Sequence, residues 1–414
     1  MGNAFVCVKS LQPSSEQLSA LTIITRNFIA QLKKSLVQGK INGHVFVGGS
    51  FAKGTLLAQD TYDVDVFIRC KEVTPQLIDH LGEILITYNS QTIRVHGSRD
   101  YFQLPTTKQL IFEVVPVKKI RKPREMENVT DLSYFHVAYV AKHMTKKLAG
   151  EIVLAKAFCA SAGVYGAESY IQGFSGYALE CLLIRYKTFK AMLKALVSVE
   201  KQVLIDPAKH YRSAGDLMRS MSESRRSGPL VIVDPTWPER NVAAALSQES
   251  FVLFQKRAKA YLVRPSERFF AEEAFDSQKL QKEATQKKAT LLAVSLETNK
   301  QAGDIAGTKL RKFHLFLCEI LGERFTLAKH VFRYEQGQTS MSYLLLKDKQ
   351  SVQHGPLLSM TKHALAFKKA HPAAKMAKGR YYLTLPPVTP QIYLQQKVRK
   401  ELLVQMDISR FQID

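Results

Sequence analysis

Two aspartates, Asp63 and Asp65, stand one residue apart in an apolar run. Because a β-strand turns successive side chains to opposite faces, both carboxylates should point the same way, while Val64 and Val66 point into a core. Two carboxylates on one face offer the hard oxygen ligands that divalent metal ions prefer. The pair therefore predicts a metal site on a strand.

A turn of small residues, Gly48-Gly49-Ser50, precedes the pair at a distance that leaves room for a helical turn and a return into the sheet. Glycines in such a turn let backbone N–H groups approach phosphate oxygens closely. Phosphate, metal and a reacting hydroxyl in one place indicate phosphoryl or nucleotidyl transfer.

A third carboxylate is offered by Glu113, the only acid in the strand-like segment 110–116. A lone carboxylate is costly to bury there unless it binds a metal ion or a partner. The alternative is that Glu113 faces solvent on an edge strand.

The elements around these acids form a small α/β unit. Ser14 and Gln17 predict a capping box that begins a helix over 15–37. Strands are expected at 44–47, 64–69, 93–95 and 110–115, and a short helix at 76–85. The middle of the chain is predicted to be helical, over 151–162, 177–196 and 242–263.

Beyond a polar segment at 276–288, which fits a linker or an exposed helix, the pattern changes again. A strand at 291–296, a helix at 310–321, a hairpin of 327–334 and 341–346, a helix at 358–369 and a strand at 381–385 follow in order. This β-α-β-β-α-β order is typical of a ferredoxin-like or RNA-recognition-type sheet.

The chain has a formal net charge of +23 and a pI near 9.7. Such an excess attracts polyanions, first of all nucleic acid; a generally basic proteome is the alternative. The five cysteines are odd in number and form no Cys-x-x-Cys, which predicts a reduced compartment and no structural zinc. No apolar run approaches the roughly 20 residues of a membrane span, and no signal peptide is recognisable, so a cytoplasmic protein is expected.

The order of Gly49-Ser50, the two aspartates and Glu113 resembles the nucleotidyltransferase superfamily that includes DNA polymerase β and poly(A) polymerases. Three further blocks, Tyr165–Tyr177, Asp234–Ala244 and Gly355–His363, resemble the archaeal-type (class I) CCA-adding enzymes, which are tRNA nucleotidyltransferases. The matches run in family order from about residue 14 to 382.

This resemblance implies an α+β multidomain protein. A polymerase β-like nucleotidyltransferase catalytic head is expected at 1–135, a helical neck or central nucleotide-binding domain at 136–272, and a ferredoxin- or RRM-like, tRNA-binding body and tail at 273–414.

The resemblance also assigns roles. Asp63, Asp65 and Glu113 fall on the catalytic, metal-binding carboxylates, which imply two Mg²⁺ ions, with Mn²⁺ as the alternative. The nucleotide-binding residues would be Gly49, Ser50, Lys53, His136, Lys156, Tyr165 and Arg240, with Arg240 near an arginine that reads the base edge.

The residues by themselves leave other interpretations open for four of these positions. Lys156 fits a snorkelling surface lysine, His136 a core histidine, Tyr165 a packing residue and Arg240 a helix-cap partner.

The sequence also departs from the family. Glu113 stands where aspartate is expected. Lys53 replaces an arginine, so the ammonium group acts as a point charge where a guanidinium would make two parallel hydrogen bonds to a phosphate. The region after residue 272 is shorter and matches loosely.

The implied activity is template-independent addition of C, C and A to the 3′ end of tRNA from CTP and ATP. Its partners would be the tRNA acceptor stem and 3′ end, with no membrane and with a homodimer allowed. Two alternatives stay open: a poly(A) polymerase or another terminal RNA nucleotidyltransferase, and a non-catalytic RNA-binding relative.

Overall fold

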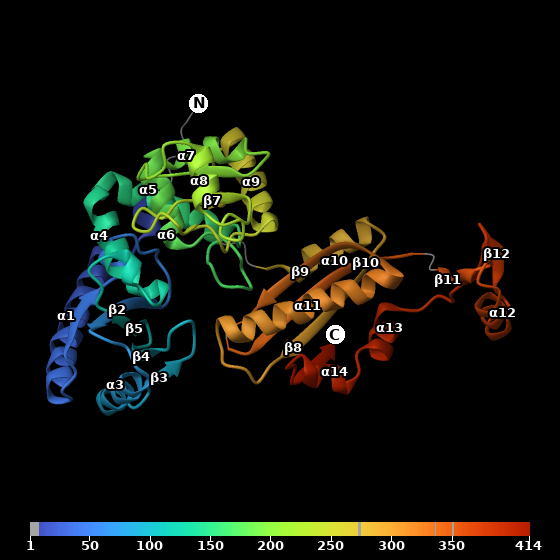
Figure 1. The fold of residues 1–414 in the computed structure, drawn as a ribbon, viewed down its shortest axis with the longest axis horizontal. Helices are drawn as coiled ribbons and strands as arrows, with labels where there is room; N and C mark the ends of the chain where they lie inside the picture. Colours follow the sequence, from blue (N-terminus) through green and yellow to red (C-terminus); the bar gives the residue numbers. More distant parts are fainter. Residues whose placement is uncertain (1–7, 272–274, 336, 350–351) are drawn as a thin grey trace. The chain divides into compact units, whose positions relative to one another are not determined.

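The computed structural model describes residues 8–271, 275–335, 337–349 and 352–414 (Figure 1). The chain divides into two compact units, Met1–Glu273 and Ala274–Asp414. The predicted boundary between head and neck falls inside the first unit and stays a prediction. The predicted boundary at 272–273 lies outside the described residues.

A mixed five-stranded sheet forms the base of the first unit, in the order β1-β2-β5-β4-β3. Its strands are β1 (Gly43–Val47), β2 (Tyr62–Cys70), β3 (Ile93–Val95), β4 (Tyr101–Thr107) and β5 (Leu110–Lys118). β2 and β5 run parallel, and the other neighbours are antiparallel. The four predicted strands are all present, and β4 is an addition to them.

Two helices, α1 (Ser15–Gln38) and α3 (Pro75–Tyr88), pack on one face of this sheet (Figure 1). The predicted capping box of Ser14 and Gln17 is present at the start of α1. Phe28 of α1 stacks on Phe112 of β5, with ring centroids 4.0 Å apart. Val64 is fully buried in the same core, as strand alternation predicts, so its neighbours in β2 are directed to the opposite face.

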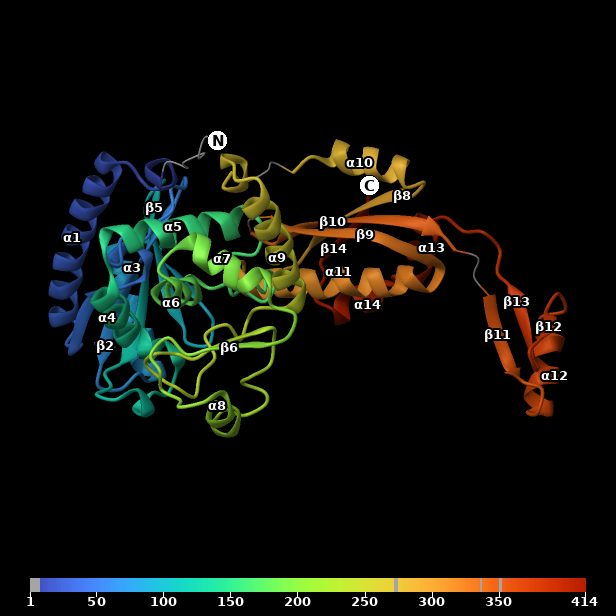
Figure 2. The ribbon, with the colours of Figure 1, turned by 90° about the horizontal axis from the view of Figure 1, so that it is seen from above.

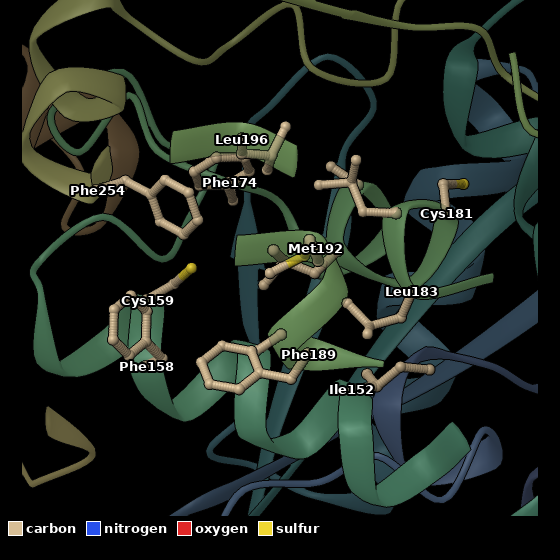
Figure 3. Packing of buried hydrophobic residues seen from close by; sticks show 14 of the residues in the cluster. Ile152, Phe158, Cys159, Phe174, Cys181, Leu183, Phe189, Met192, Leu196 and Phe254 are labelled. Atoms are coloured by element: carbon tan, nitrogen blue, oxygen red, sulfur yellow. The ribbon is translucent and has the colours of Figure 1, made fainter. Parts of the chain in front are cut away.

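A helical layer follows. It contains α4 (Ser133–His143), α5 (Lys146–Ser161), α6 (Gly176–Tyr186), α7 (Phe189–Val197), α8 (Ala214–Ser220) and α9 (Gln248–Val263), with the parallel pair β6 (Val203–Ile205) and β7 (Leu230–Ile232). Short 3₁₀ turns lie at Val8–Leu11, Pro123–Glu125, Val129–Leu132 and Glu267–Phe269. The core of the helical layer contains many aromatic side chains. Phe158 of α5 packs edge to face on Phe189 of α7, with ring centroids 5.3 Å apart, next to Met192 (Figure 3).

Two of the predicted helices differ from the structure. The helix expected over 177–196 breaks at Lys187, whose φ of 68° is left-handed, and Thr188 then caps α7. The helix expected from 242 begins only at Gln248. Before it, the Asn241 side chain accepts from the backbone N–H groups of Ile232 and Ala243, which holds this stretch against β7. In both places a local polar contact overrides the apolar periodicity.

The second unit contains a four-stranded antiparallel sheet in the order β14-β8-β10-β9. Its strands are β8 (Thr290–Glu297), β9 (Phe325–Tyr334), β10 (Thr339–Asp348) and β14 (Arg410–Ile413). Helices α10 (Ser277–Gln286) and α11 (Asp304–Arg324) cover opposite faces of it (Figure 2). Numbered within this sheet alone, the strand order is 4-1-3-2, as in a ferredoxin-like fold.

The fourth strand of this sheet is not the predicted one. The helix and strand expected at 358–369 and 381–385 belong to a separate three-stranded sheet of β11 (Val352–Leu357), β13 (Arg380–Thr384) and β12 (Lys375–Ala377), with α12 (Thr361–Ala370). The chain then passes through α13 (Pro390–Lys397) and α14 (Lys400–Gln405) into β14. The order of elements alone cannot distinguish an inserted sheet from the last strand of the main one.

Candidate active site

The three predicted carboxylates come together on the first sheet. β2 and β5 are parallel neighbours whose register pairs Asp65 directly with Glu113. Asp63 lies two residues earlier in β2, on the same face. Asp63 is exposed, and the other two are half-buried. The fold thus turns a sequence separation of nearly fifty residues into one continuous acidic face.

β4 supplies a polar neighbour that sequence reasoning missed. Gln103 is the cross-strand partner of Glu113, and its Nε2 donates to Glu113 Oε1 at 2.9 Å. This bond fixes the direction of the glutamate side chain, which is one methylene longer than the aspartate expected there. A glutamine directly between the apolar, buried Phe102 and Leu104 was the available signal.

Burial raises the pKa of Asp63, Asp65 and Glu113, and it raises that of Glu113 to about 7. For Asp65, the nearby charge of Lys53 lowers the pKa and that of Asp63 raises it, but burial has the larger effect. Within the described part of the chain, no Lys or Arg forms an ion pair with any of the three. A set of converging carboxylates without a protein cation fits bound divalent ions, because such ions supply the missing positive charge.

The small-residue turn packs directly against these acids. It forms the single-turn helix α2 (Gly49–Ala52), and the Gly48 N–H donates to the Asp65 carbonyl oxygen at 2.9 Å. Gly49 has a φ of 60°, and a Cβ there would lie 1.6 Å from Asp65 Oδ2. Both the backbone conformation and the space therefore require glycine. Ser50 follows it, half-buried in the same turn.

Lys53 and Lys156 meet at a buried acid, Glu180 of α6. Lys53 Nζ lies 2.6 Å from Glu180 Oε2, and Lys156 Nζ lies 3.1 Å from Glu180 Oε1. Lys156 also donates to Thr55 Oγ1 at 2.9 Å. Lys156 is only 1% exposed, so it is not a snorkelling surface lysine. The opposite charges of the two lysines keep the pKa of Glu180 below its usual value, although burial opposes this.

Tyr165 joins the same group through Gly176, the first residue of α6. A Cβ at Gly176 would lie 3.2 Å from the Tyr165 hydroxyl and 3.6 Å from Lys156 Nζ. Gly176 therefore lies next to both a hydroxyl donor and an ammonium donor, two kinds of group that hydrogen-bond to phosphate oxygens.

His136 and Arg240 meet at a second buried acid, Asp234. Asp234 Oδ2 lies 3.1 Å from His136 Nε2 and 2.8 Å from Arg240 Nη1. Its other oxygen accepts from Tyr177 Oη at 3.2 Å and from the Thr236 backbone N–H at 2.8 Å. These donors and charges keep the pKa of Asp234 below its usual range despite burial. Burial lowers the pKa of His136.

Tyr177 connects the two groups. Its ring stacks on His136 with centroids 4.1 Å apart, and Lys53 Nζ lies 5.9 Å from the centroid of the same ring. Beyond Arg240 there is a pocket of about 340 Å³. It is lined by Val129, Ala167, Ser175, Arg225, Trp237 and the segment 239–245 without Ala243.

The structure thus places every predicted site residue in one of three adjoining clusters. Asp63, Asp65, Glu113 and Gly49 with Ser50 form the first, Lys53, Lys156 and Tyr165 the second, and His136 with Arg240 the third. Sequence reasoning missed the acids that organise the last two. Glu180 is a lone acid in an apolar helix, which was a usable signal; Asp234 entered the prediction only as the first residue of the block Asp234–Ala244.

The sequence model described as "tRNA nucleotidyltransferase, second domain" matches residues 150–271. A CCA-adding enzyme of Methanosarcina barkeri is 30% identical over 393 residues, which cover 91% of this chain and 83% of that protein. The chain belongs to the archaeal-type CCA-adding enzyme family. The predicted resemblance is therefore confirmed.

Other members of the CCA-adding enzyme family match over a shorter length. The Nanoarchaeum equitans protein is 41% identical over 220 residues, which are 53% of this chain and 55% of that protein. The Halobacterium salinarum protein is 30% identical over 304 residues, which are 71% of this chain and 63% of that protein. In these two comparisons the chain spans less than two thirds of its relatives.

Solved structures confirm the nucleotidyltransferase fold. The Cid1 RNA terminal uridylyl transferase superposes with a TM-score of 0.52 at 10% identity, covering 65% of this chain and 96% of that one. A cytoplasmic RNA terminal U-transferase gives 0.50 at 12% identity, with the same coverage. None of the described helices combines the length and the hydropathy that crossing a bilayer requires.

Proposed function

We propose that this chain is a CCA-adding tRNA nucleotidyltransferase, which adds C, C and A to the 3′ end of tRNA from CTP and ATP and releases pyrophosphate. One observation carries the proposal: the parallel register of β2 and β5, which sets Glu113 beside Asp65 and on the face of Asp63. Family membership supplies the substrate class.

Asp63, Asp65 and Glu113 are the residues that would hold two divalent ions, Mg²⁺ in the first place and Mn²⁺ as a substitute. When bound there, such ions make the tRNA 3′-hydroxyl more acidic and neutralise the charge of the leaving pyrophosphate. The chain itself positions these acids: Gly49 leaves space for the Asp65 carboxylate, and Gln103 directs Glu113.

The triphosphate would lie along the second cluster. Candidate donors there are the backbone N–H groups of the Gly49–Ser50 turn, the hydroxyls of Ser50 and Tyr165, and the ammonium groups of Lys53 and Lys156. Both lysines pair with Glu180. Because Glu180 already holds Lys53 and Lys156 in place, the two ammonium groups are preorganised and need no reorganisation when a phosphate arrives.

The nucleoside would occupy the pocket beside Arg240. Asp234 holds the Arg240 guanidinium at 2.8 Å, which leaves its remaining N–H groups to donate to a base edge. His136 is neutral at physiological pH because burial lowers its pKa, so its ring is suited to stacking and hydrogen bonding rather than to charge neutralisation.

The tRNA would be held through its phosphates and its shape. The second unit offers a suitable segment, since residues 349–400 contain no Asp or Glu and many Lys and Arg. We further propose that the protein is cytoplasmic. We also propose that it forms a homodimer, and light scattering of the full chain tests this second point.

The deciding experiment incubates the full chain with tRNA that lacks its 3′ CCA and with CTP alone, ATP alone or both. We expect two C residues from CTP alone, and C, C and A followed by a stop when both are present. A long homopolymeric tail would instead assign the chain to the terminal nucleotidyltransferases. An absence of metal-dependent pyrophosphate release would leave only a non-catalytic RNA-binding role.

A second experiment varies the salt concentration. If the chain binds tRNA through several phosphates, the logarithm of the binding constant should fall steeply and linearly with the logarithm of the salt concentration. Replacing Lys362, an exposed lysine of α12, by alanine should reduce that slope by about one. Affinity that hardly changes with salt would contradict the phosphate contacts.

A further inference from the structure

Three potential metal ligands meet in the second unit, within a part of the fold that nucleotidyl transfer does not use. His314, Cys318 and His330 each direct one ligand atom to the same point, and these atoms all lie within 4.8 Å of one another. His314 and Cys318 come from α11, and His330 comes from β9.

The sequence and the packing explain why the three side chains meet. His314 and Cys318 are four residues apart and therefore share one face of α11. That face packs on the sheet, in which β9 is an edge strand. His314 is buried, whereas Cys318 and His330 are half-buried. The cluster is thus partly enclosed but keeps a route to solvent.

The distances fit a tetrahedral metal ion. His314 Nε2 lies 3.0 Å from His330 Nδ1 and 3.7 Å from Cys318 Sγ. With zinc–nitrogen and zinc–sulfur bonds of about 2.05 and 2.3 Å, tetrahedral angles place two nitrogens about 3.3 Å apart and a nitrogen about 3.6 Å from a sulfur. These two separations are within a few tenths of an ångström of the tetrahedral values, and the third pair of ligand atoms lies within 4.8 Å.

A simple hydrogen bond between the two histidines accounts for less of this arrangement. It explains the 3.0 Å contact, but it gives the thiol no reason to lie at the same nitrogen. Among the described residues, His314 Nδ1 has no hydrogen-bond partner, so the polar contacts of this buried ring are directed to the cluster.

We propose that His314, Cys318 and His330 bind a zinc-type divalent cation, with a water molecule in the fourth position. Zinc is bound by imidazole nitrogens and thiolate sulfurs, and its catalytic sites have three protein ligands and a water molecule. Two imidazoles with one thiolate also occur in copper sites, so Cu²⁺ is the competing ion to compare with Zn²⁺ in the test. Sequence analysis predicted no structural zinc because it looked for Cys-x-x-Cys. Here one cysteine and one histidine share a helix face, and the third ligand comes from a strand.

The ion would join α11 to the edge strand β9 and so stabilise the second unit, independently of catalysis. Within the described ranges, no partner holds the second ring nitrogen of His314, and such partners normally strengthen a zinc–histidine bond. The affinity should therefore be lower than that of a fully supported zinc site, and the metal should be removable by a chelator.

The test uses the full chain, stripped of metal with a chelator and kept reduced, in excess Mg²⁺ so that the carboxylates of the first unit are occupied. Cobalt(II) is then added as a spectroscopic substitute for zinc, followed by Zn²⁺ in competition. We expect one equivalent of cobalt to give a sulfur-to-cobalt charge-transfer band, which one equivalent of Zn²⁺ removes. Cys318 is the only cysteine of residues 274–414.

Two variants assign the ligands. Cys318→Ser should abolish the band, and His330→Gln, which keeps a hydrogen-bonding side chain, should weaken Zn²⁺ binding by at least about a hundredfold, above the effect of removing a supporting group. The matched control is His363→Ala, which changes an exposed histidine of α12 and should bind as the parent does. Zn²⁺ should raise the melting temperature of the parent and of the control only.

A parent chain without the sulfur band overturns the proposal, whatever the variants do. So does Zn²⁺ affinity that neither variant changes. If Cys318→Ser abolishes the band but His330→Gln binds like the parent, a single thiolate holds the metal and the three-ligand site is wrong. Circular dichroism of each metal-free variant verifies that its fold is retained.

Discussion

The first unit holds two kinds of inward-facing carboxylate, and they differ in what surrounds them. Glu180 contacts two lysines, Asp234 contacts Arg240 and the imidazole of His136, and the pKa values of both acids are lowered. Asp65 and Glu113 lie side by side on the neighbouring strands β2 and β5, and their pKa values are raised. Burial acts in the same direction on all four, so the difference comes from the neighbours.

This comparison distinguishes acids that stabilise the arrangement of the site from acids that would bind the metal ions of the reaction. A buried acid with its cations already in place stabilises the arrangement of the site, and removing it leaves charges unpaired. A set of acids without cations is unfavourable in the folded chain alone, and becomes favourable when metal ions bind. The two kinds of acid should therefore respond in opposite ways to substitution.

The largest expected effect is on activity. Asp65→Ala removes a ligand of both proposed ions and should reduce nucleotide incorporation about a thousandfold or more, which corresponds to the several kcal/mol that such ions contribute. The stability of the metal-free chain should not fall, because an uncompensated acid is lost. Asp60→Ala, an exposed acid just before β2, is the control. Substantial residual CMP and AMP incorporation by Asp65→Ala would reject the assignment.

The next effect is on stability. Glu180→Ala leaves Lys53 and Lys156 without their acid in a buried site and should lower the free energy of unfolding by about 3–5 kcal/mol. Urea denaturation measures this, with the exposed Glu200→Ala as the control. If Glu180→Ala were as stable as the parent, the two kinds of acid would not differ in the way proposed here.

A smaller effect is expected from Gln103, which supports a metal ligand without being one. Gln103→Leu removes the N–H that favours ionised Glu113, so the pKa of Glu113 should rise further and the metal affinity should fall by about 10–100-fold. Raising the Mg²⁺ concentration should restore most of the activity. Gln109→Ala, in the exposed turn before β5, should change nothing; a loss that Mg²⁺ cannot restore would point to a damaged fold instead.

For a step of one pH unit, the smallest effect is the pH dependence of stability, which has opposite signs for the two kinds of acid. The pKa of Glu113 is raised to about 7, so this residue lowers the stability of the metal-free chain as pH rises from about 4.5 to 7, by about 1.4 kcal/mol for each unit of pKa difference. The pKa of Asp234 is lowered, so its contribution is complete above about pH 4 and is lost as pH falls below that.

Denaturation of each variant and of the parent at several pH values measures the contribution of each acid. Glu113→Gln should remove the decrease in stability between pH 4.5 and 7. Asp234→Asn should remove part of the decrease in stability as pH falls below about 4. If both variants followed the parent curve, neither acid would have the surroundings described above.

Much of the fold and of the candidate site could be predicted from the sequence. Strand alternation placed Asp63 and Asp65 on one face, and the capping box of α1 was readable from Ser14 and Gln17. Both are local effects of backbone geometry, which operate within a few residues. The break at Lys187 was missed because the cap of Thr188 overrode the apolar periodicity, and the late start of α9 was missed because Asn241 is hydrogen-bonded to the backbone of β7.

The sequence by itself determined which acids, glycines and cations the chain has, which of them share a strand or helix face, and which family it belongs to. Only the tertiary structure decided that Glu113 lies beside Asp65, that Glu180 and Asp234 hold the cations of the site, and that Cys318 meets two histidines. Contacts between distant residues depend on sheet order, register and helix packing, and these arise from burial across the whole unit rather than from any local pattern.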